Sequence, residues 1–165
     1  MKHLLICRHA KSSWKNPRLA DFDRPLNKRG KRNAPRMGKM LVSHGIHPDL
    51  IVSSPAKRAK KTALQLAKKL NYPKKRIVYR DRIYSATPDE LIDCIHTFDD
   101  HSNQAIVIGH NSGFTTLANI LGNLHIDNVP TCGIVALKFE VDSWKDVEKK
   151  KGIFDFFYYP KMTGS

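Results

Sequence analysis

An arginine and a histidine stand together where the first apolar run of the chain ends. Residues 4–7 are Leu-Leu-Ile-Cys, and Arg8 and His9 follow directly. The guanidinium of arginine presents a planar fork of donors that matches two oxygens of a phosphate. A neutral imidazole can attack phosphorus and form a covalent intermediate. The pair therefore suggests phosphoryl chemistry, but an adjacent arginine and histidine also occur at strand ends for purely structural reasons.

A second histidine and a second arginine follow two later apolar runs. His110 lies directly after one of them, in a Gly-His-Asn turn before a predicted helix, and Arg58 lies in the first turn of another predicted helix. A cation at a helix N-terminus opposes the helix dipole, so Arg58 is best explained by an anion bound beside it. His110 could donate a hydrogen bond to a phosphoryl oxygen in the transition state. Arg8, Arg58 and His110 would together surround one trivalent anion beside a nucleophilic His9.

Short apolar runs alternate with amphipathic stretches, and this alternation brings those residues together. Strands are expected at about residues 4–7, 50–52, 77–79, 105–108, 133–141 and 153–159, and helices at about 28–43, 56–70, 87–98 and 113–121. The pattern predicts an α/β three-layer sandwich with a mostly parallel central sheet, helices on both faces and one antiparallel edge. Catalytic residues in such folds gather at the carboxyl ends of the strands. The chain of 165 residues is expected to form a single domain, 1–165.

The charge is distributed unevenly along the chain. The formal net charge is +14, but residues 1–80 hold 22 Lys/Arg and 3 Asp/Glu, whereas residues 81–165 hold 7 and 12. Such an excess indicates an anionic partner, which could be a phosphorylated substrate, an acidic protein or nucleic acid. No helix-turn-helix, zinc finger or aromatic RNA-binding motif is present, so nucleic acid is the least favoured of these. Most of the cations fall on the predicted helices at 28–43 and 56–70, where they would form a basic surface that steers acidic substrates.

Cysteine usage and hydropathy indicate a cytoplasmic protein with no metal and no membrane span. Cys7, Cys94 and Cys132 form no C-x-x-C pair, and no segment has the length of a signal sequence or of a transmembrane helix. The one candidate metal pair, His44-x-x-His47, has no further ligands nearby. No cofactor is expected.

Several motifs, taken together and in this order, resemble the histidine phosphatase superfamily. They include Arg8-His9-Ala10, Arg24-Pro25-Leu26 with Arg29-Gly30, Ser53-Ser54-Pro55 with Arg58 and Thr62-Ala63, and Gly109-His110-Asn111. Within that superfamily, residues 8–14, 23–30 and 84–91 look like the short SixA-type phosphohistidine phosphatases. The resemblance covers nearly the whole chain and implies a phosphoglycerate mutase-like fold. It also implies that His9 is the nucleophile, that Arg8, Arg58 and His110 bind the phosphate, and that no metal is required.

The sequence departs from the superfamily pattern at two kinds of position. Ala10 replaces the usual glycine, and no residue stands out as the acid that protonates an ester leaving group; the candidates are Asp81, Asp89 and Glu90. Glu90 is more simply a capping-box partner of Thr87. A phosphohistidine substrate has a P–N bond and a better leaving group, so it would tolerate a missing acid. Further candidates at the rim of the phosphate pocket are Lys11, Ser13, Lys15 and Asn16.

Two functions follow from these observations. The first is a phosphatase that hydrolyses phosphohistidine in a protein, or small phosphomonoesters, through a covalent phosphohistidine on His9. The alternative is a basic binding module for an acidic phosphoprotein or nucleic acid, without catalysis. The expected partner is therefore a phosphorylated protein or a small phosphorylated substrate, and no membrane. The arrangement of Arg8, His9, Arg58 and His110 at strand ends is explained by the first function alone.

Overall fold

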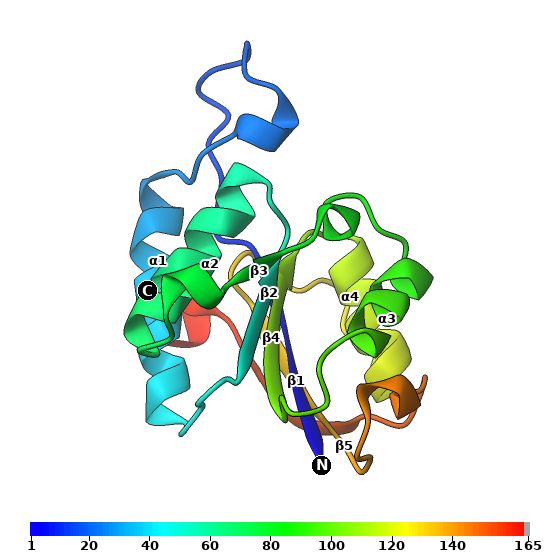
Figure 1. The fold of residues 1–165 in the computed structure, drawn as a ribbon. Helices are drawn as coiled ribbons and strands as arrows, with labels where there is room; N and C mark the ends of the chain where they lie inside the picture. Colours follow the sequence, from blue (N-terminus) through cyan, green and yellow to red (C-terminus); the bar gives the residue numbers. More distant parts are fainter. Residues whose placement is uncertain (164–165) are drawn as a thin grey trace.

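A six-stranded sheet lies between two layers of helices in the computed structural model, which describes residues 1–163 (Figure 1). The strands are β1 (Lys2–Arg8), β2 (Leu50–Ser53), β3 (Val78–Tyr79), β4 (Gln104–Gly109), β5 (Ile134–Phe139) and β6 (Ile153–Tyr158). Their order in the sheet is β3-β2-β4-β1-β5-β6. The first four are parallel, whereas β5 is antiparallel to both β1 and β6. The predicted α/β sandwich with one antiparallel edge is confirmed.

Each face of the sheet is covered by one pair of helices. Helices α1 (Lys28–Ser43) and α2 (Lys57–Lys69) lie on one face, and α3 (Pro88–His96) and α4 (Gly113–Gly122) lie on the other (Figure 1). Side chains of a strand point alternately to the two faces. In β1, Leu5 and Cys7 accordingly pack in the core beneath α1 and α2, while Leu4 and Ile6 pack in the core beneath α3 and α4. The central strand is thus buried on both sides.

The helices begin where their capping residues predict. The side chain of Asn27 accepts a hydrogen bond from the backbone of Gly30 at the start of α1, at 2.8 Å. Thr87 and Glu90 form a complete capping box at the start of α3. Helix α1 runs continuously through Pro35, although a proline has no N–H to donate to the preceding turn. None of the helices in residues 1–163 combines the length and hydrophobicity that a bilayer crossing requires.

The carboxyl ends of β1, β2 and β4 meet at one edge of the sheet. Arg8 is paired with Gly109, and Ser53 with Ile108. The chain beyond each strand therefore starts at the same level, and the backbone of His9 still donates to the carbonyl of Gly109 at 3.0 Å. Above this edge rises the segment 11–27, the blue loop at the top of Figure 1, which carries a short 3-10 turn, η1 (Asp21–Asp23). The topology thus leaves the predicted site residues and this segment on the same side of the molecule.

The last strand is only partly buried. β6 pairs with β5 alone, at the edge of the sheet. Ile153 and Phe154 are 47% and 49% exposed, whereas Phe156 and Tyr158 pack against the core beneath α1 and α2. Four further 3-10 turns complete the described elements: η2 (Lys74–Arg76), η3 (Asp81–Ile83), η4 (Trp144–Asp146) and η5 (Pro160–Thr163).

Candidate active site

His9 is held in one tautomer, in which Nε2 carries no proton. The residue is 7% exposed, and its Nδ1 lies 2.7 Å from the carbonyl oxygen of Ala10. A carbonyl can only accept, so Nδ1 carries the proton. Nε2 accepts a hydrogen bond from Nε of Arg58 at 3.3 Å. Nε2 is therefore the unprotonated nitrogen of the ring, which is the state that a nucleophilic imidazole requires, and its lone pair is engaged by Arg58 in this structure.

Burial keeps both histidines of the site neutral. Desolvation lowers the pKa of His9 to about 3, and the charges of Arg58 and Arg8 act in the same direction. Desolvation and the charge of Arg58 likewise lower the pKa of His110 to about 4. Both values lie below the ordinary histidine pKa near 6.5. The imidazole of His9 is thus neutral at neutral pH.

His110 faces His9 across the site. The centres of the two rings are 5.1 Å apart, and Nε2 of His110 lies 2.7 Å from Oγ of Ser54, at the end of β2. Nδ1 of His110 is buried and has no hydrogen-bond partner among residues 1–163. The ring of Tyr84 packs edge-on against His110, with 5.4 Å between the ring centres. These contacts fix the ring of His110 beside the nucleophile.

Two arginines bring positive charge to the nucleophile. Arg58, in the first turn of α2, is 6% exposed and contacts His9 directly. Arg8 donates from Nη1 to the carbonyl of Val129 at 2.9 Å, and its buried Nε has no partner among the described residues. Burial lowers the pKa of Arg8 from its ordinary value, but an arginine remains charged at neutral pH. The four residues predicted from the strand ends therefore form one cluster.

Asp21 is an acidic member of the site that the sequence did not single out. Its Oδ2 accepts hydrogen bonds from Nη2 of Arg58 at 2.9 Å and from the hydroxyl of Tyr84 at 2.7 Å. Its Oδ1 accepts from Nη1 of Arg24 at 2.9 Å, and its backbone oxygen accepts from Nη1 of Arg58 at 2.7 Å. The hydrogen bond from Tyr84, together with the two arginines, holds the pKa of Asp21 well below its usual range. An anion thus lies against Arg58, as the charge at the start of α2 predicted, but it belongs to the chain itself.

Thr62 belongs to the family-like Thr62-Ala63 pair, for which the sequence predicted no role, and it also takes part in the site. It is fully buried in α2, and its Oγ1 accepts a hydrogen bond from the backbone N–H of Ala10 at 2.9 Å. The same hydroxyl donates to the carbonyl of Arg58 at 2.8 Å. Because the carbonyl of Ala10 orients His9, Thr62 connects the positions of the nucleophile and of the arginine. Ala10, in place of glycine, is fully buried in this arrangement.

The three acids considered as proton donors are not bonded to the cluster around His9. Glu90 is bonded to Thr87 in the capping box and is exposed, and Asp89 pairs with Lys149 at 2.9 Å. Asp81 lies in η3, where its backbone carbonyl accepts from the N–H of Tyr84. Within residues 1–163, none of these three side chains forms a hydrogen bond or ion pair with His9, Arg58 or His110. The acid that contacts the site is Asp21.

The predicted rim residues line a separate basic groove next to the site. Ser13, Lys15 and Asn16 border a hollow of about 780 Å³ between segment 11–27 and the first turns of α1, whereas Lys11 is exposed nearby. The groove also contains Lys28, Arg29, Lys31 and Arg32. No carboxylate of residues 1–163 lies within ion-pair distance of these cations. The structure therefore separates a compact cluster around His9 from a basic surface beside it.

No metal site is apparent in the described part of the chain. Within residues 1–163, no group of three or more His, Cys, Asp or Glu side chains is arranged to hold an ion. The ring of His44, one of the two histidines considered for metal, stacks on Tyr158 with 4.7 Å between ring centres. His44 is thus part of the packing between α1 and β6.

Comparison with known proteins gives matches over most of the chain. An uncharacterized protein of Mycobacterium tuberculosis (strain H37Rv) is 30% identical over 164 residues, which covers 93% of this chain and 99% of the relative. An uncharacterized chloroplastic protein of Arabidopsis thaliana is 29% identical over 153 residues, or 88% of this chain and 70% of the relative.

Solved structures and a family profile extend the comparison. A structure from Agrobacterium tumefaciens, assigned as the phosphohistidine phosphatase SixA, superposes with a TM-score of 0.81 at 27% identity and covers 96% of this chain and 98% of the other. A structure of the protein histidine phosphatase SixA complexed with tungstate has a TM-score of 0.82 at 17% identity, with 97% and 98% covered. The profile of the histidine phosphatase superfamily (branch 1) matches residues 4–83, which include Arg8, His9 and Arg58. The chain therefore belongs to the histidine phosphatase superfamily.

Proposed function

We propose that the protein is a phosphatase that acts through a covalent phosphohistidine on His9, with phosphohistidine in a protein as the preferred substrate and small phosphomonoesters as the second choice. The observation that carries this proposal is the unprotonated Nε2 of His9, fixed by the Nδ1 contact to Ala10 and flanked by Arg58 and His110. A phosphoryl group that draws the guanidinium of Arg58 to its own oxygens leaves the lone pair of Nε2 to attack phosphorus. Membership of the superfamily and the likeness to SixA structures support a phosphatase function.

The first step transfers the phosphoryl group to His9. The lone pair of Nε2 attacks phosphorus in line with the leaving group, and a P–N bond to His9 forms as the bond to the leaving group breaks. The leaving group takes the electron pair and a proton from solvent. Arg8, Arg58 and His110 bind the phosphoryl oxygens, on which the charge of the transition state is spread. Nδ1–H, bonded to Ala10, keeps the ring oriented.

The second step releases phosphate. A water molecule attacks phosphorus, the bond to Nε2 of His9 breaks, and the electron pair returns to the ring. The proton of the water leaves to solvent. The low pKa of His9 helps here, because a weakly basic imidazole is a good leaving group at neutral pH.

The electrostatics of the site favour a substrate with a good leaving group. Asp21, the acid in contact with the site, is held ionised by Tyr84, Arg58 and Arg24, so it is poorly suited to protonate an alkoxide. Phosphohistidine does not need a strong acid, because its leaving imidazole is far more stable than an alkoxide. This difference supports protein phosphohistidine over alkyl phosphates.

A panel of substrates tests the proposal. Phosphate release is measured from a phosphohistidine peptide, a phosphoserine peptide and p-nitrophenyl phosphate, with the wild-type protein and with His9→Ala. We expect the highest kcat/KM for the phosphohistidine peptide, and a loss of at least about a thousandfold in His9→Ala, because the nucleophile itself is removed. Wild-type turnover by His9→Ala would refute the mechanism.

The alternative function is a basic binding module without catalysis, and the unpaired cations of the groove beside the site favour it. The same panel separates the two functions. A binding module would hold the phosphopeptide without releasing phosphate, and His9→Ala would not affect its affinity. The buried free thiols of Cys7, Cys94 and Cys132 support a cytoplasmic location for either function.

A further inference from the structure

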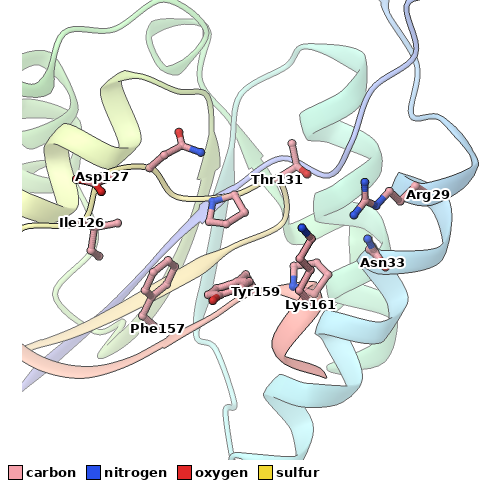
Figure 2. A pocket seen from close by; sticks show the side chains of 11 residues that line it. Arg29, Asn33, Ile126, Asp127, Thr131, Phe157, Tyr159 and Lys161 are labelled. Atoms are coloured by element: carbon pink, nitrogen blue, oxygen red, sulfur yellow. The ribbon is translucent and has the colours of Figure 1, made fainter. Parts of the chain in front are cut away.

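The loop between α4 and β5 passes directly beside the guanidinium of Arg8. Residues 123–133 form neither helix nor strand, so side chains must set the position of this loop. Figure 2 shows part of it, with Ile126, Asp127 and Thr131 labelled, along a cavity of about 510 Å³. Of residues 126–131, Val129 alone does not line this cavity; it is fully buried, and its carbonyl accepts from Nη1 of Arg8 at 2.9 Å.

A stripe of three polar side chains holds the main chain of the loop. Asn111 lies just before α4, and Thr115 and Asn119 lie within it, each four residues after the last. This spacing places successive side chains on the same side of a helix. Asn119 donates to the carbonyl of Ile126 at 2.8 Å and accepts from its N–H at 2.9 Å. The stripe thus supplies the hydrogen bonds that a helix or a sheet would otherwise give to this part of the loop.

The other two members of the stripe hold Val129 itself. The N–H of Val129 donates to Oγ1 of Thr115 at 3.0 Å, and its carbonyl accepts from Nδ2 of Asn111 at 3.0 Å. The hydroxyl of Thr115 donates in turn to Oδ1 of Asn111 at 2.9 Å. Nδ2 of Asn111 also donates to Oδ1 of Asn128 at 2.9 Å. The carbonyl that accepts from Arg8 is therefore fixed in direction by a closed set of hydrogen bonds.

The bond to Val129 orients Arg8 without cancelling its charge. It is the one hydrogen bond of this guanidinium within residues 1–163, where no carboxylate pairs with Arg8 and its buried Nε has no partner. A guanidinium has five N–H donors, so those that remain are available to a bound anion. Arg58 differs, because the carboxylate of Asp21 already contacts it. Arg8 is thus the arginine of the site that is positioned by a neutral acceptor.

We propose that Asn111 is a positioning residue that aims Arg8 at the phosphoryl group through the carbonyl of Val129. The inference rests on the proposed function, since it is that function which assigns phosphoryl oxygens to Arg8. A long side chain that is already oriented loses less conformational freedom when it binds an anion. Loss of Asn111 should therefore weaken anion binding, although none of its hydrogen bonds within residues 1–163 reaches Arg8 or His9.

Binding of orthovanadate tests this step separately from turnover. The dissociation constant is measured by calorimetry for the wild type, for Asn111→Ala and for Asn119→Ala. Both substitutions remove hydrogen bonds to the main chain of the same loop, but Asn111 alone of the two bonds to Val129. We expect Asn111→Ala to bind orthovanadate roughly tenfold more weakly and Asn119→Ala to stay within about twofold of the wild type. Thermal unfolding shows that each variant is folded.

A double-mutant cycle tests whether Asn111 acts through Arg8. In a chain that already carries Arg8→Ala, the further change Asn111→Ala should alter the affinity by less than about twofold. Thr115→Val gives a second route to the same step, because it removes the hydroxyl that holds the N–H of Val129. It should weaken binding in the same direction, and Thr115→Ser should restore it.

Four results would overturn the inference: equal losses in Asn111→Ala and Asn119→Ala, losses that multiply in the cycle, unchanged affinity in Thr115→Val, or wild-type affinity in Arg8→Ala. The phosphatase proposal is judged instead by phosphate release in His9→Ala, so any of these results leaves it standing. Conversely, a protein that binds orthovanadate through an oriented Arg8 but releases no phosphate would refute the phosphatase proposal and support this inference.

Discussion

The carboxylate of Asp21 is hydrogen-bonded to the guanidinium of Arg58, which a bound phosphoryl group would also need. It contacts Arg58 through both its side chain and its backbone oxygen, and Tyr84 and Arg24 hold it there. A phosphorylated substrate that approaches His9 therefore competes with this carboxylate for Arg58. The side chain of Asp21 is half exposed, so it can turn outward without breaking the core.

Substitution of Asp21 by asparagine removes the competing charge and keeps the shape of the side chain. We expect Asp21→Asn to bind orthovanadate about tenfold more tightly, because a charge-assisted hydrogen bond to Arg58 no longer has to be broken. The inhibition constant measures this effect. Asp23→Asn, in the same turn, is the control. A large fall in kcat for the phosphohistidine peptide in Asp21→Asn would instead identify Asp21 as a proton donor.

The protonation of His9 gives a second prediction at this scale. Because burial lowers the pKa of His9 to about 3 and that of His110 to about 4, neither ring takes up a proton between pH 8 and 5. In the unfolded chain both would titrate near 6.5. The folded state thus binds fewer protons than the unfolded state below that value, so the two groups reduce stability as the pH falls from about 7 toward 4.

NMR titration of the imidazole resonances measures these pKa values. The Hε1 and ring ¹⁵N signals of His9 and His110 should remain those of neutral rings down to pH 5. A midpoint near 6.5 for His9 would contradict the burial argument.

Among the elements, α2 has the largest part in the site. It brings Arg58 to His9 with its first turn and, one turn later, fixes Ala10 through Thr62. The end of β1 and the start of α2 are therefore joined by a single buried hydroxyl, although the two residues are 52 positions apart in the chain. The geometry of the nucleophile depends on how α2 packs against the sheet.

Replacement of Thr62 by valine removes the hydroxyl and preserves the volume. The N–H of Ala10 then has no acceptor, and an unsatisfied buried group costs about 1–3 kcal/mol of stability. We expect Thr62→Val to lower the free energy of unfolding by that amount and to lower kcat more than it raises KM, because His9 loses its alignment. Thr62→Ser should recover both quantities. Thr97→Val, at the end of α3, is the matched control.

Elements with local signals were predictable from the sequence, whereas tertiary contacts were not. The starts of α1 and α3 follow from Asn27 and from the Thr87–Glu90 box, which act within one turn. Asp21 and Thr62 acquire their roles only through contacts across 37 and 52 residues. One signal for Asp21 was present: it and Asp23 are the only acids before Asp49, in a strongly basic region. For Thr62 the sequence held only the family-like Thr62-Ala63 pair, which indicated no role for the hydroxyl.

At the scale of the whole molecule, one concentration of positive charge lies in the groove beside the predicted active site. The groove formed by segment 11–27 and α1 contains Lys15, Lys28, Lys31 and Arg32, and it begins only a few residues after His9. A concave surface of one sign concentrates ligands of the opposite sign and raises association rates. The groove is therefore expected to affect acidic substrates and to leave small ones unchanged.

Neutralisation of the groove tests this expectation. The triple variant Lys28→Gln, Lys31→Gln, Arg32→Gln should lower kcat/KM for a phosphohistidine peptide with acidic flanks by roughly tenfold at low salt, and by less at high salt. The value for p-nitrophenyl phosphate should not change. Lys61→Gln, Lys68→Gln, Lys75→Gln alters the net charge equally on another surface and is the control. An equal effect of both triples would show that only net charge matters.

The position of β1 between β4 and β5 gives the two sides of the site unequal local stability. His9 follows a strand that is paired on both edges and buried on both faces, so the amides of β1 should exchange with solvent only when the whole molecule unfolds. Asp21 and Arg24 belong to an outer segment whose two ends are joined by the bridge between Ser12 and Leu26 and a few flanking hydrogen bonds, and which contacts the rest of the site through Arg58 and Tyr84. We therefore expect that local opening of segment 11–27 can move Asp21 away from Arg58 while His9 keeps its position at the end of β1.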